Sequence, residues 1–271
     1  MATRRLNRNQ TRARLRELGI DRAPLPAFAF AEDARRLSYD WHTHRQHQLL
    51  YSVRGTARLQ SKFAQFLLPP QRAAWIPAGT RHATHVNGAE IVSIYFNRSW
   101  AKARELQVFE VPPLLREMVL YARRWPIVRG RKDAHATAFF RALVGVIGTL
   151  THRAPAYELP RARTELTRAA MTWVLGHLET SELGAAAKHC GTTPRTLRRR
   201  FLAETGLHFR AFVLQARMQR AMELLGEPSR SIVEVALDVG FRSQSAFAQA
   251  FRRVTGQAPR DFRKAAAGAA T

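Results

Sequence analysis

Three histidines in the first third of the chain have the spacing of a shared binding site. His42 and His44 are two residues apart and precede Gln48, and His82 follows the Pro-x-Gly turn that ends at Gly79. Residues two apart on a strand face the same side of a sheet, so His42 and His44 can point into one interior. His82, arriving on another strand, can complete a set of three imidazoles, which is a ligand type that suits Zn, Cu, Fe or Ni.

The chemistry of this histidine cluster stays open between three readings. The imidazoles can line a small-molecule pocket without a metal, together with Gln48 and Trp75. They can hold a divalent metal through His42, His44 and His82. They can also have a structural role at strand ends, where imidazole nitrogens bond to backbone groups.

Arginine side chains are concentrated on a predicted helix in the last third of the chain. Thr193 and Pro194 predict its start, because threonine caps helix N-termini and proline is favoured in the first turn. Leu197 and Phe201, four residues apart, predict the buried side, which leaves an outward face of Arg195, Arg198, Arg199 and Arg200. Guanidinium groups bind guanine edges in the major groove and also bind phosphates, so this face predicts a DNA-reading helix.

The same arrangement occurs twice in the chain. Leu183–Gly191 matches Ile232–Gly240 at an offset of 49. Further along the chain, Phe201 matches Phe251 at an offset of 50. Each copy predicts a short helix, a turn at the glycine, where a positive φ is needed, and a second helix. Ala187 and Ala236, four residues before these glycines, are predicted where the paired helices touch.

The second copy presents more amides and hydroxyls than charges. Its core residues are predicted to be Phe247 and Phe251, and its outward groups are Arg242, Ser243, Gln244, Ser245 and Gln249. Such side chains can bind adenine edges or hold phosphates. A long helix from about His208 to Leu225 is predicted to join the copies, which would set two reading helices about one DNA turn apart.

The second copy resembles the signature of the AraC/XylS family of transcription regulators. From Ile232 to Arg263 it has Ala-x3-Gly-Phe, then aromatic-x3-Phe, then Gly-x2-Pro-x2-Phe-Arg; the first copy departs from this with Phe209 where the second has Pro259. The resemblance implies base contacts by Arg195, Arg198 and Arg199 in the first reading helix and by Gln244, Ser245 and Gln249 in the second. It also implies double-stranded DNA and a small-molecule effector as partners. We further expect a homodimer, an activator and contact with RNA polymerase.

The histidine spacing resembles the two cupin motifs, and cupin-type sensor domains are common in that family. The usual motif has Glu where this chain has Gln48, and a neutral amide adds no negative charge to a metal site. A divalent metal at the cupin histidines therefore remains one open expectation. A metal-dependent cupin dioxygenase or isomerase with a helical DNA-binding appendage is the alternative function. Non-specific coating of nucleic acid is a third.

Composition supports a polyanionic partner. The chain has 271 residues with 44 Lys and Arg against 20 Asp and Glu, a formal charge of +24. Cys190 is the single cysteine, which excludes an intramolecular disulfide or a thiolate zinc cluster and fits a reducing cytoplasm. Apolar runs of membrane-span length and a secretory signal are both lacking in the sequence, so we expect a cytoplasmic protein without a membrane partner.

These patterns predict an α+β multidomain fold. The expected order is a basic flexible tail over 1–24, a cupin-like β-barrel sensor domain over 25–105, helices for packing or dimerisation over 106–151, a linker over 152–163, and an all-α domain of two helix-turn-helix units joined by a long helix over 164–271. The barrel is predicted from short apolar runs broken by glycine and proline. The helices after it are predicted from apolar residues at helical spacing.

Overall fold

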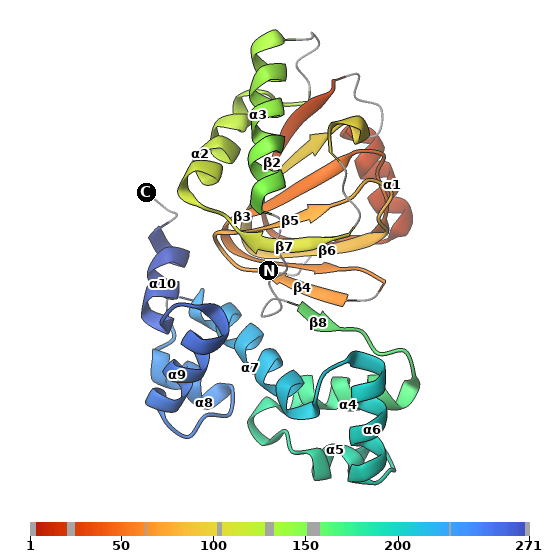
Figure 1. Ribbon diagram of the computed structural model, residues 1–271, viewed down its shortest axis with the longest axis vertical. Helices are drawn as coiled ribbons and strands as arrows, with labels where there is room; N and C mark the ends of the chain where they lie inside the picture. Colours follow the sequence, from red (N-terminus) through yellow and green to blue (C-terminus); the bar gives the residue numbers. More distant parts are fainter. Residues whose placement is uncertain are drawn as a thin grey trace. The chain divides into compact units, whose positions relative to one another are not determined.

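The computed structural model describes residues 4–20, 25–62, 64–101, 105–127, 133–150, 158–227 and 229–268. These residues form two compact units, an N-terminal unit that holds the sheet with α1 to α3 and a C-terminal unit of helices (Figure 1). The predicted α+β fold, with a sheet-rich N-terminal domain and an all-α C-terminal domain, is thereby confirmed. Among the described residues, no helix combines the length and the apolar character that crossing a membrane requires.

The N-terminal residues pack on the sheet. β1 (Arg4–Leu6) pairs in parallel with β2, and α1 (Arg8–Glu17) begins with a capping box between Asn7 and Gln10. Thr11 is fully buried, and its hydroxyl accepts a hydrogen bond of 3.0 Å from the backbone N–H of Asp40 in β2. The prediction of a flexible tail over 1–24 is therefore wrong for residues 4–20, because capping and buried contacts offset the entropy of ordering. Residues 1–3 and 21–24 lie outside the described residues.

The sheet of the N-terminal unit is built on three long antiparallel strands. β6 lies between β2 and β3, the strand order is β1-β2-β6-β3-β4, and β5 pairs with β3 and β7. The strands that follow β1 are β2 (Ala27–His42), β3 (His47–Gln60), β4 (Ala64–Leu68), β5 (Arg72–Ile76), β6 (His82–Phe96) and β7 (Gln107–Glu110). The apolar runs predicted as strands all fall within β3, β4, β5 and β6.

Gly55 bends β3 and does not end it, although the sequence predicts a break there. Its φ is +69°, and the pairing register between β3 and β6 shifts at Ser52, Arg54 and Thr56. The Ser52 hydroxyl donates a hydrogen bond of 3.0 Å to the carbonyl of Gly55. Glycine tolerates a positive φ without steric cost, so the chain makes a bulge and continues as strand.

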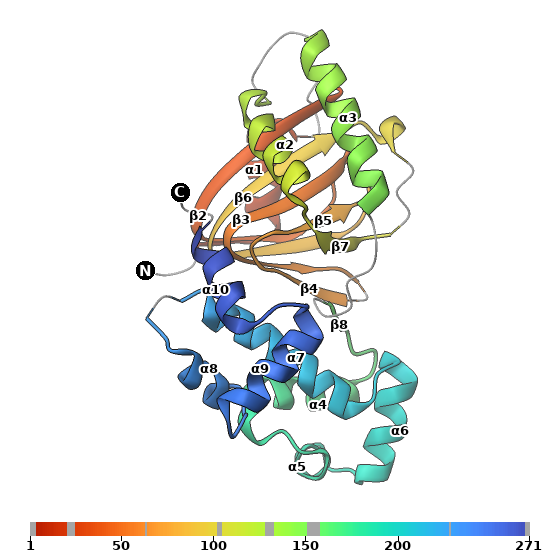
Figure 2. The same ribbon diagram turned by 60° about the vertical axis from the view of Figure 1, so that its left-hand side comes forward.

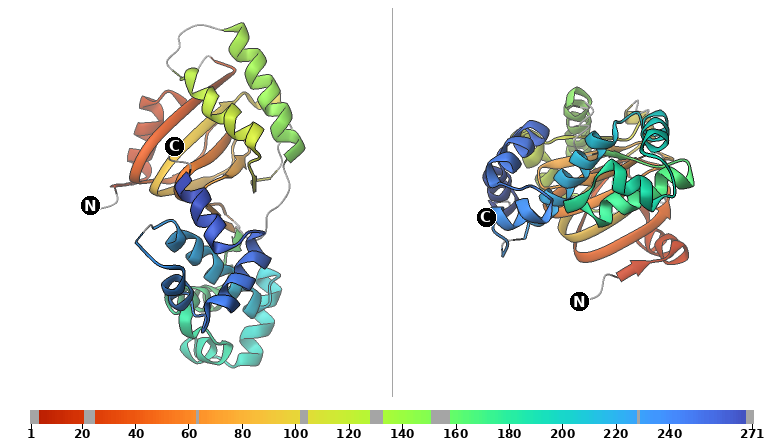
Figure 3. Two further views of the ribbon diagram at one scale, coloured as in Figure 1. Left: turned by 90° about the vertical axis from the view of Figure 1, so that its left-hand side faces the viewer. Right: turned by 90° about the horizontal axis from the view of Figure 1, so that it is seen from below.

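The two faces of the sheet are covered by different helices. One face, with Leu49 and Ile94, packs against α2 (Pro113–Tyr121) and α3 (Ala134–Leu150) in the main core of this unit. On the other face, Phe28 and Tyr95 form a smaller core with the end of α1. Figure 2 shows α2 and α3 across one side of the sheet, and the left view of Figure 3 shows α1 on the opposite side. Both helices predicted after the barrel are present.

The C-terminal unit contains the predicted repeat. Its elements are β8 (Glu158–Pro160), α4 (Glu165–Gly176), the 3-10 turn η5 (Leu178–Thr180), α5 (Leu183–His189), α6 (Pro194–Thr205), α7 (Phe209–Leu225), α8 (Ile232–Asp238), α9 (Gln244–Thr255) and α10 (Pro259–Gly268). The joining helix predicted from about His208 to Leu225 is α7. The predicted linker over 152–163 is corrected by the strand β8, while residues 151–157 lie outside the described residues.

Each helix-turn-helix is closed by the same local interactions. Gly191 and Gly240 have φ values of +61° and +82°, which confirms the predicted positive-φ turn in both copies. The backbone N–H after each turn returns to the carbonyl of Ala187 or Ala236, through bonds of 3.0 Å from Thr192 and 2.9 Å from Phe241. Both alanines are about 1% exposed, because the two helices of each pair meet there.

Candidate nucleic-acid interface and effector pocket

The first reading helix, α6, presents arginine on its solvent side. Thr193 is its N-cap and accepts a hydrogen bond from the N–H of Thr196, and Pro194 occupies the first turn. Leu197 and Phe201 are fully buried, as predicted. The predicted contact residues Arg195, Arg198 and Arg199 are exposed, and within the part of the chain that the structure describes they have no ion-pair partner. Free guanidinium groups on a fixed helix are suited to bind base edges or phosphates.

The second reading helix, α9, has the same frame with a different surface. Phe247 and Phe251 are fully buried, and the predicted contact residues are all exposed: Arg242, Ser243, Gln244, Ser245 and Gln249. Ser243 is the N-cap of α9, and its hydroxyl accepts a hydrogen bond of 3.3 Å from the N–H of Ala246. Its side chain therefore fixes the helix start, which places Gln244 and Ser245 in the first turn.

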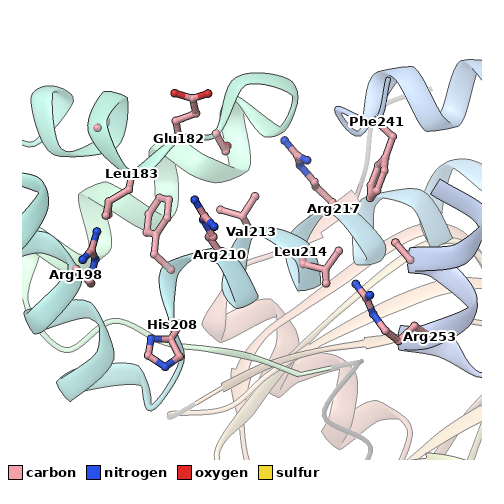
Figure 4. A pocket seen from close by; sticks show the side chains of 14 residues that line it. Glu182, Leu183, Arg198, His208, Arg210, Val213, Leu214, Arg217, Phe241 and Arg253 are labelled. Atoms are coloured by element: carbon pink, nitrogen blue, oxygen red, sulfur yellow. The ribbon is translucent and has the colours of Figure 1, made fainter. Parts of the chain in front are cut away.

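A groove of about 990 Å³ lies along α7 between the two helix-turn-helix copies. Figure 4 shows Arg198 of α6 at one end and Arg253 of α9 at the other, with Arg210 of α7 between them. Arg217 also lines the groove and lies beside Phe241, with its guanidinium carbon 5.7 Å from the ring centre. The groove thus adds cations to the surface that joins the two reading helices.

Arg217 fixes the turn of the second copy against the first copy. Its Nε donates to the carbonyl of Leu178 at 2.9 Å and its Nη2 donates to that of Glu179 at 3.3 Å. A Cβ placed on Gly240 would lie 2.7 Å from Cα of Glu179 and 2.8 Å from both the carbonyl of Leu178 and Nη2 of Arg217. The absence of a side chain at Gly240 therefore allows this close backbone contact, which sets the spacing of α6 and α9.

The three cupin histidines come together in the N-terminal unit. The ring centres of His42 and His82 are 4.3 Å apart, those of His44 and His82 are 5.1 Å apart, and those of His42 and His44 are 6.3 Å apart. The Nδ1 atoms of His42, His44 and His82 lie 2.6 to 2.9 Å from backbone carbonyls of Asp40, Gln46 and Thr80. For His42 and His82 these carbonyls favour the tautomer with the proton on Nδ1, whereas Nε2 of His44 also faces an acceptor oxygen, Oε1 of Gln48.

The histidine cluster does not fit a metal ion. Across the described ranges, no group of three or more His, Cys, Asp or Glu side chains could hold one. The Gln48 side chain lies 2.9 Å from Nε2 of His44, and its amide nitrogen donates to Ser93 at 2.9 Å. The expectation of a divalent metal at His42, His44 and His82 is therefore not supported, since the amide at position 48 engages one of the three nitrogens.

A small apolar cavity of about 40 Å³ adjoins this cluster. It lies on the α1 side of the sheet and is lined by Leu15, Leu18, Ile20, Phe30, Leu50, Val86 and Ile91, with polar groups from His42, Gln48, Ser93 and Tyr95. His82 is fully buried next to it, and no hydrogen-bond partner contacts its Nε2. An apolar wall with a few convergent polar groups is the usual character of a small-molecule site.

The prediction that Trp75 lines this pocket is wrong. Trp75 pairs across the sheet with Leu49, and both belong to the core beneath α2 and α3. Successive residues of a strand point to opposite faces, so Trp75 faces away from Gln48. Its ring stacks on His47 with centres 5.5 Å apart, and His47 accepts a hydrogen bond from the N–H of Ala78. His47 thus belongs to the structural core and not to the pocket.

We expect the N-terminal unit to lose stability as the pH falls below about 6.5. Burial, together with His42 and His44, holds the pKa of His82 well below the ordinary value of 6.5, and burial also lowers the pKa of His47. Below pH 6.5 the unfolded chain binds protons that the folded chain does not bind, so the free energy of unfolding falls by at most about 1.4 kcal/mol per pH unit for each group.

Denaturant unfolding between about pH 7.5 and 5.5 measures this loss. His82→Leu should reduce the pH dependence of the unfolding free energy, whereas the same measurement on a variant of the exposed His135, His135→Gln, should reproduce the wild-type dependence. An unchanged pH dependence in His82→Leu would show that folding does not lower the pKa of His82.

Comparison with known protein families gives two matches that together cover most of the chain. Residues 25–161 match the model of the AraC-like ligand binding domain, and residues 186–265 match a helix-turn-helix domain. The chain belongs to the AraC family of transcription regulators. It is a DNA-binding transcription regulator with an N-terminal ligand-binding domain.

Other AraC-type regulators resemble this chain over different lengths. The HTH-type transcriptional regulator NimR of Escherichia coli is 27% identical over 242 residues, which is 86% of this chain and 85% of that protein. MtrA of Neisseria gonorrhoeae is 43% identical over 68 residues, 25% of this chain and 23% of that protein. The solved DNA-binding domain of AdpA in complex with a target DNA is 32% identical, covers 38% of this chain and 93% of that structure, and has a TM-score of 0.36. The two family matches, with NimR and MtrA both named as transcriptional regulators, reject the alternative of a cupin enzyme.

Two parts of the site of this AraC-family chain were not predicted from its sequence. Arg210 and Arg217 of the groove lie on α7, where the apolar pattern indicated only a core helix. Leu15 and Leu18 of the pocket lie in the basic segment that was expected to be a tail. Their apolar spacing within an arginine-rich stretch was the available signal, but only the packing on β2 shows that the segment covers the pocket.

Proposed function

We propose that this regulator reads an asymmetric operator through two adjacent major-groove segments. The observation that carries this is the pair of equivalent helix-turn-helix copies in one compact unit, each with an exposed polar reading face. α6 would contact guanines and phosphates through Arg195, Arg198 and Arg199. α9 would contact bases through Gln244, Ser245 and Gln249, with Arg242 and the capping Ser243 at its start.

The groove between the two copies supports the proposal that the protein contacts the DNA backbone continuously from α6 to α9. Arg198, Arg210 and Arg253 line it, and a duplex that fills both major-groove segments presents phosphates between them. Arg210 and Arg253 would add affinity without sequence preference, because phosphate contacts position a protein and do not read bases. The arginine-dense first copy and the amide-bearing second copy would supply the asymmetry of the site.

Binding at raised salt distinguishes operator reading from non-specific coating. We expect the full chain to select a defined sequence from random duplexes and to retain a preference for it over a scrambled duplex as salt rises. Phosphate contacts lose affinity steeply with salt for both duplexes, whereas base contacts preserve the ratio. Equal affinity for both duplexes at every salt concentration would reject sequence-specific reading.

We further propose that a small molecule enters the N-terminal pocket and changes operator binding. Nε2 of His82 supports this, because a buried nitrogen without a partner costs about 1 to 3 kcal/mol until a ligand or water supplies a donor. The cavity of about 40 Å³ has room for little more than one water molecule, so a larger effector must displace α1 or the side chains beneath it. Its effect on DNA binding would equal its difference in affinity for the two states.

His44→Ala should alter the effector response and leave operator affinity largely intact. The substitution removes the partner of Gln48 and one ring of the histidine cluster, while the reading helices belong to a separate compact unit. Operator affinity with and without effector measures the response, and wild-type values serve as the reference. If His44→Ala also lost operator affinity relative to the wild type with no effector present, the separation of effector response from operator binding would be contradicted.

The protein would act as a homodimer, an activator and a cytoplasmic regulator. α2 and α3 support a dimer surface, since Leu114 and Tyr121 of α2 are 64% and 51% exposed although both are large and apolar. A dimer through this surface would place two asymmetric sites in tandem or inverted order on the DNA. Activation would add a contact with RNA polymerase at the promoter.

A further inference from the structure

A second pocket of the N-terminal unit, of about 310 Å³, is lined mainly by arginine. It lies between α1 and the end of β2, and its cationic side chains are Arg8, Arg12, Arg16 and Arg81. The volume lies within the range of small-molecule sites. Among the described residues, the lining contains no acidic side chain, and its apolar part comes from Leu15 and Trp41. The arginines therefore surround a concave space and are not spread over an open face.

Among the described residues, no carboxylate pairs with the arginines of this pocket. Arg8, Arg12 and Arg16 follow each other at helical spacing, and like charges four residues apart destabilise a helix. Arg8 also lies in the first turn of α1, where the helix dipole disfavours cations and no acidic residue is present. A bound anion would remove both penalties.

The nearby carboxylates are engaged elsewhere. Glu17 pairs with Arg14 at 3.1 Å, which gives Arg14 a partner that the three pocket arginines of α1 lack among the described residues. A side-chain oxygen of Asp40 accepts a hydrogen bond of 2.7 Å from the N–H of Trp41. The described side chains of the pocket thus carry only positive charge, which an anionic ligand would neutralise.

The arginine pocket has a fixed frame. The capping box at Asn7 and Gln10 sets the start of α1, and the buried Thr11 ties the helix to β2 through Asp40. Arg81 lies over the Trp41 ring, with its guanidinium carbon 5.5 Å from the ring centre. Cations held by a rigid frame bind an anion at a smaller entropic cost than cations on a mobile tail.

We infer that this pocket binds the carboxylate or phosphate group of a small organic anion. His42 and Leu15 line both the arginine pocket and the apolar cavity, so the two sites share these side chains. This inference rests on the proposal that the N-terminal unit takes a small-molecule effector, and it specifies that effector as an anion with an apolar part. The apolar part of the ligand packs against Trp41 and Leu15. The His42 ring, which lines both sites, couples binding in the pocket to the cavity.

Benzoate and its neutral analogue benzamide test the inference on the full chain, with tryptophan fluorescence as the readout. We expect benzoate to give a saturable change, benzamide to give none at equal concentration, and inorganic phosphate to compete with benzoate. Arg12→Gln/Arg16→Gln should weaken benzoate binding about ten-fold or more, because two charge-assisted contacts are removed. Both residues are exposed, so the variant should fold.

Two variants localise the signal. Arg14→Gln removes one positive charge from the same helix outside the pocket and should leave benzoate affinity unchanged. Trp41→Phe should remove most of the fluorescence change, although the chain has 5 tryptophans. Equal binding of benzamide, unchanged benzoate affinity in the double variant, or no binding of either benzoate or phosphate would overturn the inference.

Operator binding separates failure of this inference from failure of the proposed function. If benzoate needs the arginines but leaves operator affinity unchanged, the anion site stands and the effector proposal fails. If a neutral effector shifts operator affinity equally in the wild type and in Arg12→Gln/Arg16→Gln, the effector proposal stands and the anion site is rejected. If the double variant instead loses operator affinity and the wild type binds no benzoate, the arginines serve DNA phosphates and the inference is wrong.

Discussion

Gly240→Ala is expected to lower the free energy of unfolding of the C-terminal unit by about 3 kcal/mol or more. The new methyl group would lie within 2.8 Å of three atoms, two of which are backbone atoms of Leu178 and Glu179. Backbone atoms cannot rotate away, so η5 and the bonds that it accepts from Arg217 must shift. Alanine would also adopt a φ of +82°, a conformation that costs non-glycine residues additional energy.

Gly191→Ala is the matched control because it occupies the same position in the first copy. Its φ is +61°, but a Cβ there would meet nothing within 4 Å. Gly191→Ala should therefore lower the free energy of unfolding only by the cost of a positive φ in alanine, on the order of 1 kcal/mol. Thermal or denaturant unfolding of both variants measures the difference. Equal destabilisation would show that the contact between Gly240 and η5 is not tight in solution.

Arg199→Ala is expected to weaken operator binding by about 1 to 3 kcal/mol and to relax preference at one base pair. Arg199 is exposed on α6, within one turn of Arg195 and Arg198 and away from the buried Leu197 and Phe201. A bidentate contact to guanine loses both hydrogen bonds when the guanidinium is removed. Selection from random duplexes with wild type and variant measures the lost preference.

Arg200→Ala makes the same charge change on a different side of α6. Successive residues of a helix are rotated by about 100°, so Arg200 projects well away from the direction of Arg195 and Arg199. It should weaken binding to all duplexes alike and leave the selected sequence unchanged. If Arg199→Ala also leaves the selected sequence unchanged, Arg199 is not a base-contacting residue.

The C-terminal unit could be predicted in detail from the sequence because its signals are local. Capping by Thr193, the turn glycines Gly191 and Gly240, and the spacing of Leu197 and Phe201 each act within one or two turns of helix. The groove was not predictable in the same way. Arg217 contacts residues 38 and 39 positions earlier in the chain, and nothing in its neighbours along the sequence indicates that contact.

In the N-terminal unit, local sequence patterns predict less of the structure. The convergence of His42, His44 and His82 was predicted, but strand geometry accounts for only two of them: His42 at the end of β2 pairs with His82 at the start of β6, whereas His44 lies in the loop between β2 and β3. The orientation of Trp75 was not, since it depends on a register that only the paired strands define. The basic segment over 4–20 was misread as a tail, because its burial depends on Thr11 and Ile20 fitting against β2 and not on a strong helical pattern.

Hydroxyl-radical footprinting of the full chain on its selected operator tests whether two separate helices read the operator. We predict two protected segments about one helical turn, or 10 base pairs, apart within each half of the site. Arg199→Ala should lose protection of the first segment and Gln249→Ala that of the second, because the two residues lie on different reading helices. A single protected segment, or equal loss at both segments in each variant, would contradict an operator read by two separate helices.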